Sequence, residues 1–127
     1  MFKRILFPVN NSREARQATD VAVSLAKTFS AQVWILSVVA DEASVTAPET
    51  ERLLAEVAQE FKLANISITE KIVAGKPAFT ICDTADDLSI DLIIMGSQGM
   101  VVAHDHPDGS VSQTVVNLSP CAVLVVP

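Results

Sequence analysis

The stretch Asp91-Leu-Ile-Ile-Met-Gly96-Ser97-Gln98-Gly99, followed after nine residues by Gly109-Ser110-Val111, decides the fold. Its apolar residues 92–95 predict a buried strand that runs directly into a glycine. Glycines permit a sharp turn and let a ligand approach the backbone closely. The unpaired N–H groups at the start of a helix attract anions, because the peptide dipoles align there. A strand end, a glycine loop and a helix start in this order therefore predict a phosphate-binding loop.

Strand-like and helix-like segments alternate along the whole chain. We expect strands at 5–9, 32–39, 66–72, 92–95 and 122–126, helices near 15–29, 53–61, 77–88 and 109–118, and an acidic loop of small residues at 41–50. Residues 66–72 alternate between apolar and polar side chains, so we expect one face of that strand to be exposed to solvent. Strands that alternate with helices indicate a parallel sheet with helices on both faces. The predicted fold class is α/β, a single doubly wound five-stranded domain over residues 1–127.

The carboxyl ends of the predicted strands are the candidate ligand site. In doubly wound sheets, ligands bind beyond these ends, at the point where the winding reverses. The first strand ends at Pro8-Val9-Asn10, the second at Val38-Val39, and the fourth at the glycine loop. We therefore expect a ligand to contact these three strand ends together.

The composition excludes several classes of protein. Of the 127 residues, 50% are hydrophobic and 19% are charged, which excludes a disordered chain. The net charge is −6 and Lys and Arg form no run, so we expect no nucleic acid and no anionic membrane as partners. The apolar run at the amino terminus stops at Pro8, and no segment approaches the ~18 apolar residues that cross a bilayer. We therefore expect a cytoplasmic protein.

Other phosphate-binding motifs are absent from the sequence. The first strand is not followed by Gly-x-Gly-x-x-Gly, which argues against a dinucleotide-binding fold. Gly75-Lys76 precedes Pro77 rather than Ser or Thr, so we interpret it as a turn that opens a helix and not as a P-loop. A phospho-acceptor receiver domain would need carboxylates where this chain has Asn10-Asn11 and Ala74-Gly75.

No catalytic residues are evident either. Ser97, Ser110 and Ser112 have no obvious basic partner. The histidines and aspartates of residues 104–108 have no third clustered His or Cys nearby, so we assign no metal site. Cys82 and Cys121 form no Cys-x-x-Cys motif, and we interpret them as two buried free thiols.

Three parts of the sequence resemble one known family. The pattern Gly-x2-Gly-x9-Gly-Ser, formed by Gly96, Gly99, Gly109 and Ser110, resembles the ATP-binding signature of universal stress proteins. The opening residues 3–9 resemble the first strand of that family, and residues 119–126 resemble its Pro-Cys-x-Val-Leu-Val-Val close. The resemblance covers the whole chain. It implies a small cytoplasmic α/β protein with strand order 3-2-1-4-5, usually a homodimer, with a role in stress-related regulation.

The resemblance also implies a set of nucleotide-binding residues. Pro8, Val9 and Asn10 would lie by the adenine and ribose, and the Val38 backbone would contact the base. Met95 and Gly96 would pack near the ribose. The phosphates would be held by Gly99, Gly109, Ser110 and Val111. The implied cofactor is ATP or another adenine nucleotide.

Two positions depart from the family pattern. The usual residue at position 10 is Asp, whereas Asn10 offers a donor and an acceptor without charge. Asp105 and Asp108 lie in the glycine loop, where they would repel phosphate unless a cation such as Mg²⁺ screens them. The sequence thus indicates a nucleotide-binding regulator or sensor. The alternative is a stress-linked dimeric interaction module whose nucleotide pocket is vestigial, and a slow ATP hydrolase is a third reading.

The last strand predicts how the protein associates. In the implied order, residues 122–126 form an edge strand, yet every residue there is apolar. An exposed apolar edge invites pairing with another chain and needs cover. A second copy related by a two-fold axis can provide it. We therefore expect a homodimer through the strand Ala122–Val126.

Overall fold

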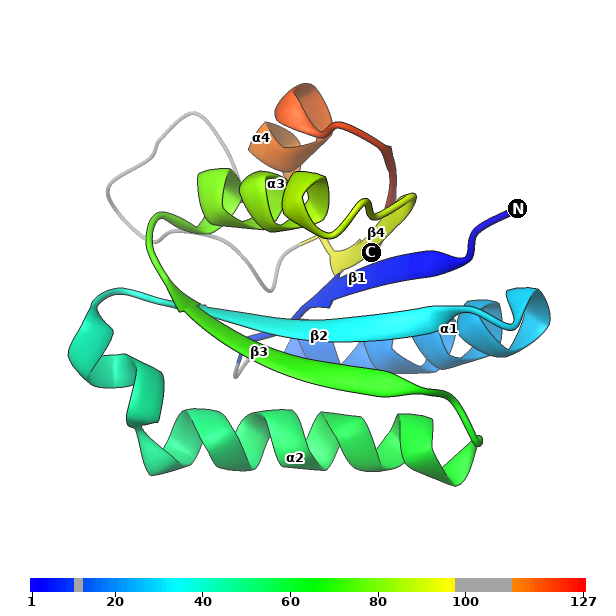
Figure 1. Cartoon of the computed structure of the whole chain (residues 1–127), viewed down its shortest axis with the longest axis horizontal. Helices are drawn as coiled ribbons and strands as arrows, with labels where there is room; N and C mark the ends of the chain where they lie inside the picture. Colours follow the sequence, from blue (N-terminus) through cyan, green and yellow to red (C-terminus); the bar gives the residue numbers. More distant parts are fainter. Residues whose placement is uncertain (11–12, 98–110) are drawn as a thin grey trace.

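The computed structural model describes residues 1–10, 13–97 and 111–127 (Figure 1). Strands and helices alternate as predicted. Their order is β1 (Arg4–Pro8), α1 (Arg13–Phe29), β2 (Gln32–Val39), the 3₁₀ helix η1 (Glu42–Thr46), α2 (Pro48–Leu63), β3 (Ile68–Ala74), α3 (Pro77–Asp87), β4 (Leu92–Gly96), α4 (Val111–Leu118) and β5 (Ala122–Val126).

Within the described residues, five strands form one sheet in the order β3-β2-β1-β4-β5, and every neighbouring pair is parallel. The predicted fold class and strand order are therefore confirmed. The central strand β1 pairs with β2 on one side, where Leu6 lies opposite Trp34. On its other side it pairs with β4, where Leu6 lies opposite Ile93.

Two hydrophobic cores lie on opposite faces of the sheet, because successive side chains of a strand point to opposite faces. The helices α1 and α2 cover one face, and α3 and α4 cover the other (Figure 1). In the first core, the rings of Phe7 from β1 and Phe61 from α2 lie 5.9 Å apart. Leu6 of β1 and Trp34 of β2 face the second core, so the central strands of this sheet are covered on both sides.

The acidic segment 41–50 differs from the expected loop. It contains η1, whose start is capped by the Asp41 carboxylate, which accepts the Ser44 backbone N–H at 2.9 Å. The helix α2 then begins at Pro48, a residue favoured in the first turn because its missing N–H would have no helical partner there. The loop prediction is wrong here because the segment has no large apolar residues to reveal a helical period. The predicted third strand also begins too early, since Ile66 is buried but lies before β3.

The two edge strands have different surfaces. On β3, Thr69 and Glu70 are exposed; because successive side chains point to opposite faces, the exposure is not confined to the one solvent-facing side that the sequence predicts. On β5, the exposed residues are Ala122 and Leu124, and the whole strand is apolar. No helix in the described parts of the chain has the length and hydropathy to cross a membrane.

A carboxylate joins β1 to β4 at the amino ends of the strands. Asp91, the residue before β4, accepts the Lys3 backbone N–H at 2.9 Å and the Arg4 backbone N–H at 3.2 and 3.3 Å through its two oxygens. The Asp91 N–H in turn donates to the Arg4 carbonyl at 2.9 Å. These bonds extend the β1–β4 pairing beyond the first residues of the two strands, and those to the carboxylate are charge-assisted.

The Arg4 side chain contacts both β2 and the end of α3 at the same end of the sheet. Its guanidinium carbon lies 4.5 Å from the centre of the Trp34 ring, within the range of a cation–π contact. Its Nε–H donates to the Leu88 carbonyl at 2.9 Å, just after α3. Trp34 is 6% exposed, so this contact lies at the edge of the buried core.

Candidate functional site

The winding of the chain reverses between β1 and β4. From β1 the chain proceeds through α1, β2, α2 and β3 in one direction, and after α3 it returns to the other side of β1 to form β4 and β5 (Figure 1). The connections that leave the carboxyl ends of β1 and β4 therefore diverge to opposite faces of the sheet. This divergence opens the position at which α/β sheets bind ligands.

The carboxyl ends of β1 and β2 lie side by side. The Val9 N–H donates to the Leu36 carbonyl at 2.8 Å, which extends the pairing one residue beyond β1. Asn10 follows and is half-buried, as is Val38 near the end of β2. The structure thus brings the predicted residues of the first and second strands to one edge of the sheet.

Gly75 makes the turn after β3, next to the end of β2. Its N–H donates to the Val39 carbonyl at 2.9 Å, and its φ is +155°. A Cβ built on Gly75 would overlap the Thr80 hydroxyl of α3. Only glycine therefore fits here without rearrangement, which agrees with a turn that opens a helix.

The carboxyl end of β4 is tied to both β5 and α4. The Ser97 N–H donates to the Val126 carbonyl at 2.8 Å, and the Ser97 carbonyl accepts the Ser112 hydroxyl at 3.1 Å. Val111, the first residue of α4, is buried in the core beneath α3 and α4. The end of the strand and the start of the helix are therefore held together, as a strand–loop–helix phosphate site requires.

Several predicted residues lie outside the described residues. These are the phosphate-loop residues Gly99, Gly109 and Ser110, together with the histidines and aspartates of residues 104–108. Their assignments remain predictions. Among the described residues, no group of three or more His, Cys, Asp or Glu side chains could hold a metal ion.

Val9 and Met95, like Val111, are predicted site residues whose side chains lie inside the core. Val9 is 1% exposed and packs in the core beneath α1 and α2, whereas Met95 is fully buried in the opposite core. A ligand at the strand ends would meet the backbone atoms of these two residues unless the core repacked. Backbone groups at a strand end can donate and accept hydrogen bonds whatever the side chain.

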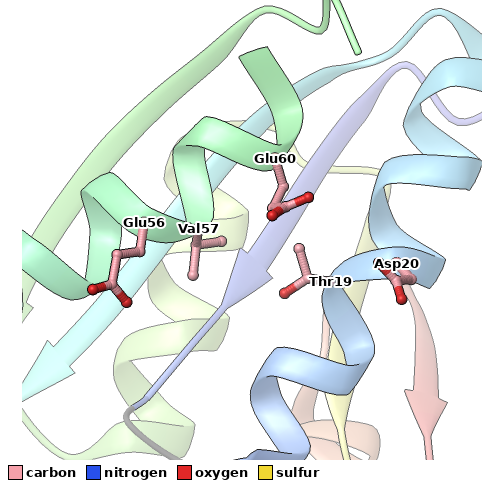
Figure 2. Close-up of a pocket in the computed structure, with 5 residues that line it drawn as sticks. All are labelled: Thr19, Asp20, Glu56, Val57 and Glu60. Carbon is pink, nitrogen blue, oxygen red and sulfur yellow. The ribbon is translucent and has the colours of Figure 1, made fainter. Parts of the chain in front are cut away.

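A hollow of about 180 Å³ lies elsewhere, between α1 and α2. Figure 2 shows Thr19 from α1 and Glu60 from α2 pointing into the space between the two helices. The remaining lining residues are Asp20, Glu56 and Val57. Three carboxylates would repel a phosphate, so this hollow does not suit a nucleotide. The sequence analysis did not identify it, because it depends on which faces of two helices meet.

The two cysteines are free and weakly reactive. Cys82 is buried and Cys121 is half-buried, so the prediction of two buried thiols is correct for Cys82 only. Burial raises the pKa of the Cys82 thiol, and the Asp83 carboxylate raises it further. Burial also raises the pKa of the Cys121 thiol, although a hydrogen bond with Ser119 opposes this effect. Both groups are therefore protonated at neutral pH, which disfavours a nucleophilic role.

Comparison with known proteins agrees with the fold. The universal stress protein family model matches residues 1–127. Universal stress protein Sll1654 of Synechocystis sp. is 40% identical over 136 residues, covering 100% of this chain and 87% of that protein. Universal stress protein YxiE of Bacillus subtilis is 30% identical over 147 residues, covering 99% of each. A solved universal stress protein in complex with cAMP has a TM-score of 0.84 at 25% identity, covering 98% of this chain and 96% of that chain. The chain belongs to the universal stress protein family.

Proposed function

We propose that residues 1–127 form one domain that binds an adenine nucleotide and acts in the cytoplasm as a stress-response regulator or sensor. One observation carries this proposal. The carboxyl ends of β1, β2 and β4 meet at the point where the winding reverses, in a fold shared with a universal stress protein that is bound to cAMP. That ligand contains adenine, ribose and phosphate, the three parts for which the sequence supplies candidate contacts.

In this proposal, the adenine, the ribose and the phosphates contact different parts of the site. The adenine lies near Asn10 and the Val38 backbone, and the ribose lies against Pro8 and the backbone of Met95 and Gly96. Val9 contributes only its backbone, since its side chain is buried. The phosphates lie at the start of α4, held by Gly99, Gly109, Ser110 and Val111.

The proposed role is binding and not catalysis. The Ser112 hydroxyl donates to a carbonyl, and both thiols have raised pKa values, so neither supports an activated nucleophile. A slow hydrolysis of ATP would need a general base near the phosphates. The vestigial-pocket alternative differs in one measurable respect, since it predicts no binding of any adenine nucleotide.

Titration calorimetry with ATP, ADP and AMP, each with and without Mg²⁺, tests the proposal. We expect heat from at least one nucleotide, and a higher affinity for ATP with Mg²⁺ because the cation screens Asp105 and Asp108. A melting scan with each nucleotide provides an independent readout, since a ligand of the native state raises the melting temperature. No heat and no stabilisation at millimolar concentration would favour the vestigial pocket.

We also propose that the protein is a homodimer through β5. The support is the contrast between the sheet edges, since β5 exposes Ala122 and Leu124 where β3 exposes Thr69 and Glu70. Val116 and Leu118 of α4, the helix before β5, are exposed as well. An apolar strand and neighbouring apolar helix residues give a second copy a surface to cover.

A lysine on each edge strand tests the dimer. Leu124→Lys should convert a dimer to monomer or aggregate, because a charge would be buried against the partner strand. Thr69→Lys adds the same side chain to the opposite edge and should remain dimeric. Sedimentation velocity of both variants and the parent decides the matter. A parent that sediments as a monomer, with the Leu124→Lys variant unchanged, would refute the proposal.

A further inference from the structure

The two cysteines of the chain come together on one face of the sheet. Cys82 belongs to α3 and is 9% exposed, within the core that α3 and α4 cover. Cys121 lies in the short connection between α4 and β5, is half-buried, and packs against the same core. Val123, two residues later, packs there too, as the alternation of side chains along an extended chain requires. The Cys121 side chain therefore points to the side of the sheet that carries α3.

The two thiols are close enough for the charge on one to affect the other. Burial raises the pKa of the Cys82 thiol, and Asp83 and the Cys121 thiol raise it further. Burial also raises the pKa of the Cys121 thiol, but a hydrogen bond with the Ser119 hydroxyl, 3.6 Å from its Sγ, opposes this effect. Cys121 is thus the more exposed thiol and the one whose thiolate receives a hydrogen bond. An oxidant should therefore react with Cys121 first.

We propose that Cys82 and Cys121 form a redox modification site, at which hydrogen peroxide converts the two thiols to one intramolecular disulfide. The Cys121 thiolate attacks a peroxide oxygen, the O–O bond breaks, and a sulfenic acid forms as the first water is released. The Cys82 thiolate then attacks the Cys121 sulfur, the S–O bond breaks, and a second water is released. The two thiols lose two electrons and two protons in total, and the peroxide takes up both. This site does not depend on nucleotide binding.

The raised pKa values affect both the formation and the cleavage of the disulfide. The thiolate is the form that attacks peroxide, so its small fraction at neutral pH makes formation slow. A thiol with a raised pKa is also a poor leaving group, so other thiols would cleave the disulfide slowly. The pair is therefore suited to a lasting response to sustained oxidation and not to rapid signalling.

The disulfide would connect α3 to the start of β5 and close a loop that contains β4 and α4. A cross-link of this kind stabilises a protein mainly by lowering the conformational entropy of the unfolded chain. The two Cβ atoms must lie about 3.5–4.5 Å apart for the bond to form. Cys121 belongs to neither α4 nor β5, so it can adjust toward Cys82 while both elements keep their positions.

Peroxide treatment of the whole chain without denaturant tests the site. The reduced parent is incubated with hydrogen peroxide, the remaining thiols are alkylated, and the intact mass and a non-reducing peptide map are recorded. Cys82→Ala and Cys121→Ala are the matched variants, since each keeps a single thiol. The melting temperature of all three proteins is measured before peroxide, after peroxide, and after reduction with dithiothreitol.

We expect the parent to lose two hydrogens, to take up no alkyl group, and to yield one peptide pair that links Cys82 to Cys121. Its melting temperature should rise by about 5–15 °C and return to the starting value on reduction. Peroxide should raise the melting temperature of neither alanine variant, because neither can close the loop. The mass and peptide map of the parent decide the question even if a variant fails to fold.

Four results would overturn the proposal. The first is a parent whose thiols both remain open to alkylation after a treatment that oxidises free glutathione completely. The second is sulfinic acid at Cys121 in the parent, formed as readily as in Cys82→Ala. The third is a cross-link that joins two copies of the chain or that appears only in urea. The fourth is a melting temperature that falls on oxidation, because the bond would then form only from a distorted fold.

Discussion

The hydrogen bonds at the two ends of the sheet are made by different groups. At the amino ends of the strands, side chains join distant segments: Asp91 holds the start of β1, Arg4 reaches Leu88 and Trp34, and the Lys3 ammonium donates to the Phe29 carbonyl at 2.7 Å. At the carboxyl ends, the hydrogen bonds within residues 1–10, 13–97 and 111–127 run mainly between backbone groups, as in the Val9, Gly75 and Ser97 N–H donors.

This difference separates stability from binding. Charged side chains that bridge β1, β4 and α3 stabilise the fold at an end where no ligand is proposed. The carboxyl ends present backbone groups and small residues, which leave room for a ligand. Changes at the amino ends should therefore alter the free energy of unfolding, and changes at the carboxyl ends should alter affinity.

Replacement of Asp91 should have the largest effect. Asp91→Ala removes the acceptor for the Lys3 and Arg4 N–H groups, and loss of hydrogen bonds to a charged group should lower the free energy of unfolding by about 1.5–3 kcal/mol. Urea titration, monitored by Trp34 fluorescence, measures the free energy of unfolding. The affinity for nucleotide should stay within about twofold of the parent.

The matched control is Asp87→Ala, which removes an exposed carboxylate at the end of α3. Surface substitutions of this kind usually change stability by less than about 0.5 kcal/mol. If Asp91→Ala weakened nucleotide binding as much as stability, the two ends of the sheet would not be independent in the way proposed.

Replacement of Gly109 should instead lower nucleotide affinity and leave the stability of the fold unchanged. A Cβ at this position would narrow the approach of the phosphates, and a positive φ there would add strain of order 1 kcal/mol or more. Gly109→Val should weaken nucleotide binding at least about tenfold, or about 1.4 kcal/mol, and leave the fold intact. Calorimetry measures the nucleotide affinity, and circular dichroism shows whether the fold is intact. Asn117→Val puts the same side chain on the exposed surface of α4 and should bind as the parent does.

The Arg4–Trp34 contact should have the smallest effect. Arg4→Lys keeps the charge but loses the planar stacking and the Nε–H donor, so the free energy of unfolding should fall by about 0.5–1 kcal/mol. Trp34 is the single tryptophan, so its emission should shift when the guanidinium 4.5 Å away is replaced. Arg52→Lys on the exposed surface of α2 is the control. An unchanged emission spectrum and denaturation midpoint would show that the contact contributes nothing.

Most of the fold could be predicted because its signals are local. β2 and β5 begin and end at the predicted residues, since β5 is a continuous apolar run and β2 is nearly so, with Ser37 as its one interior polar residue. The strand order followed from the family resemblance and from the alternating pattern of residues 66–72. The helical part of 41–50 could not be predicted, because Asp41 caps a turn of small residues that shows no apolar period.

The candidate site could be predicted in its location but not in its bonds. Pro8, Asn10 and Val38 follow from the rule for strand ends, and the structure brings them to one edge. The Ser112–Ser97 bond could not be foreseen, because it joins residues fifteen positions apart through a specific helix rotation. The Asp91 contacts span 87 and 88 positions and depend on the register of β1 against β4.

The central place of β1 has a consequence for the newly made chain. Of these five strands β1 is made first, yet one of its two neighbours, β4, begins only at Leu92. At a synthesis rate of about 5–20 residues per second, the β4 side of β1 stays unpaired for several seconds. Its residues Ile5, Leu6 and Phe7 are fully buried in the finished fold, so during that interval they form an apolar strand with an open edge. We therefore expect chaperone depletion to reduce the soluble yield of this protein more than its equilibrium stability suggests.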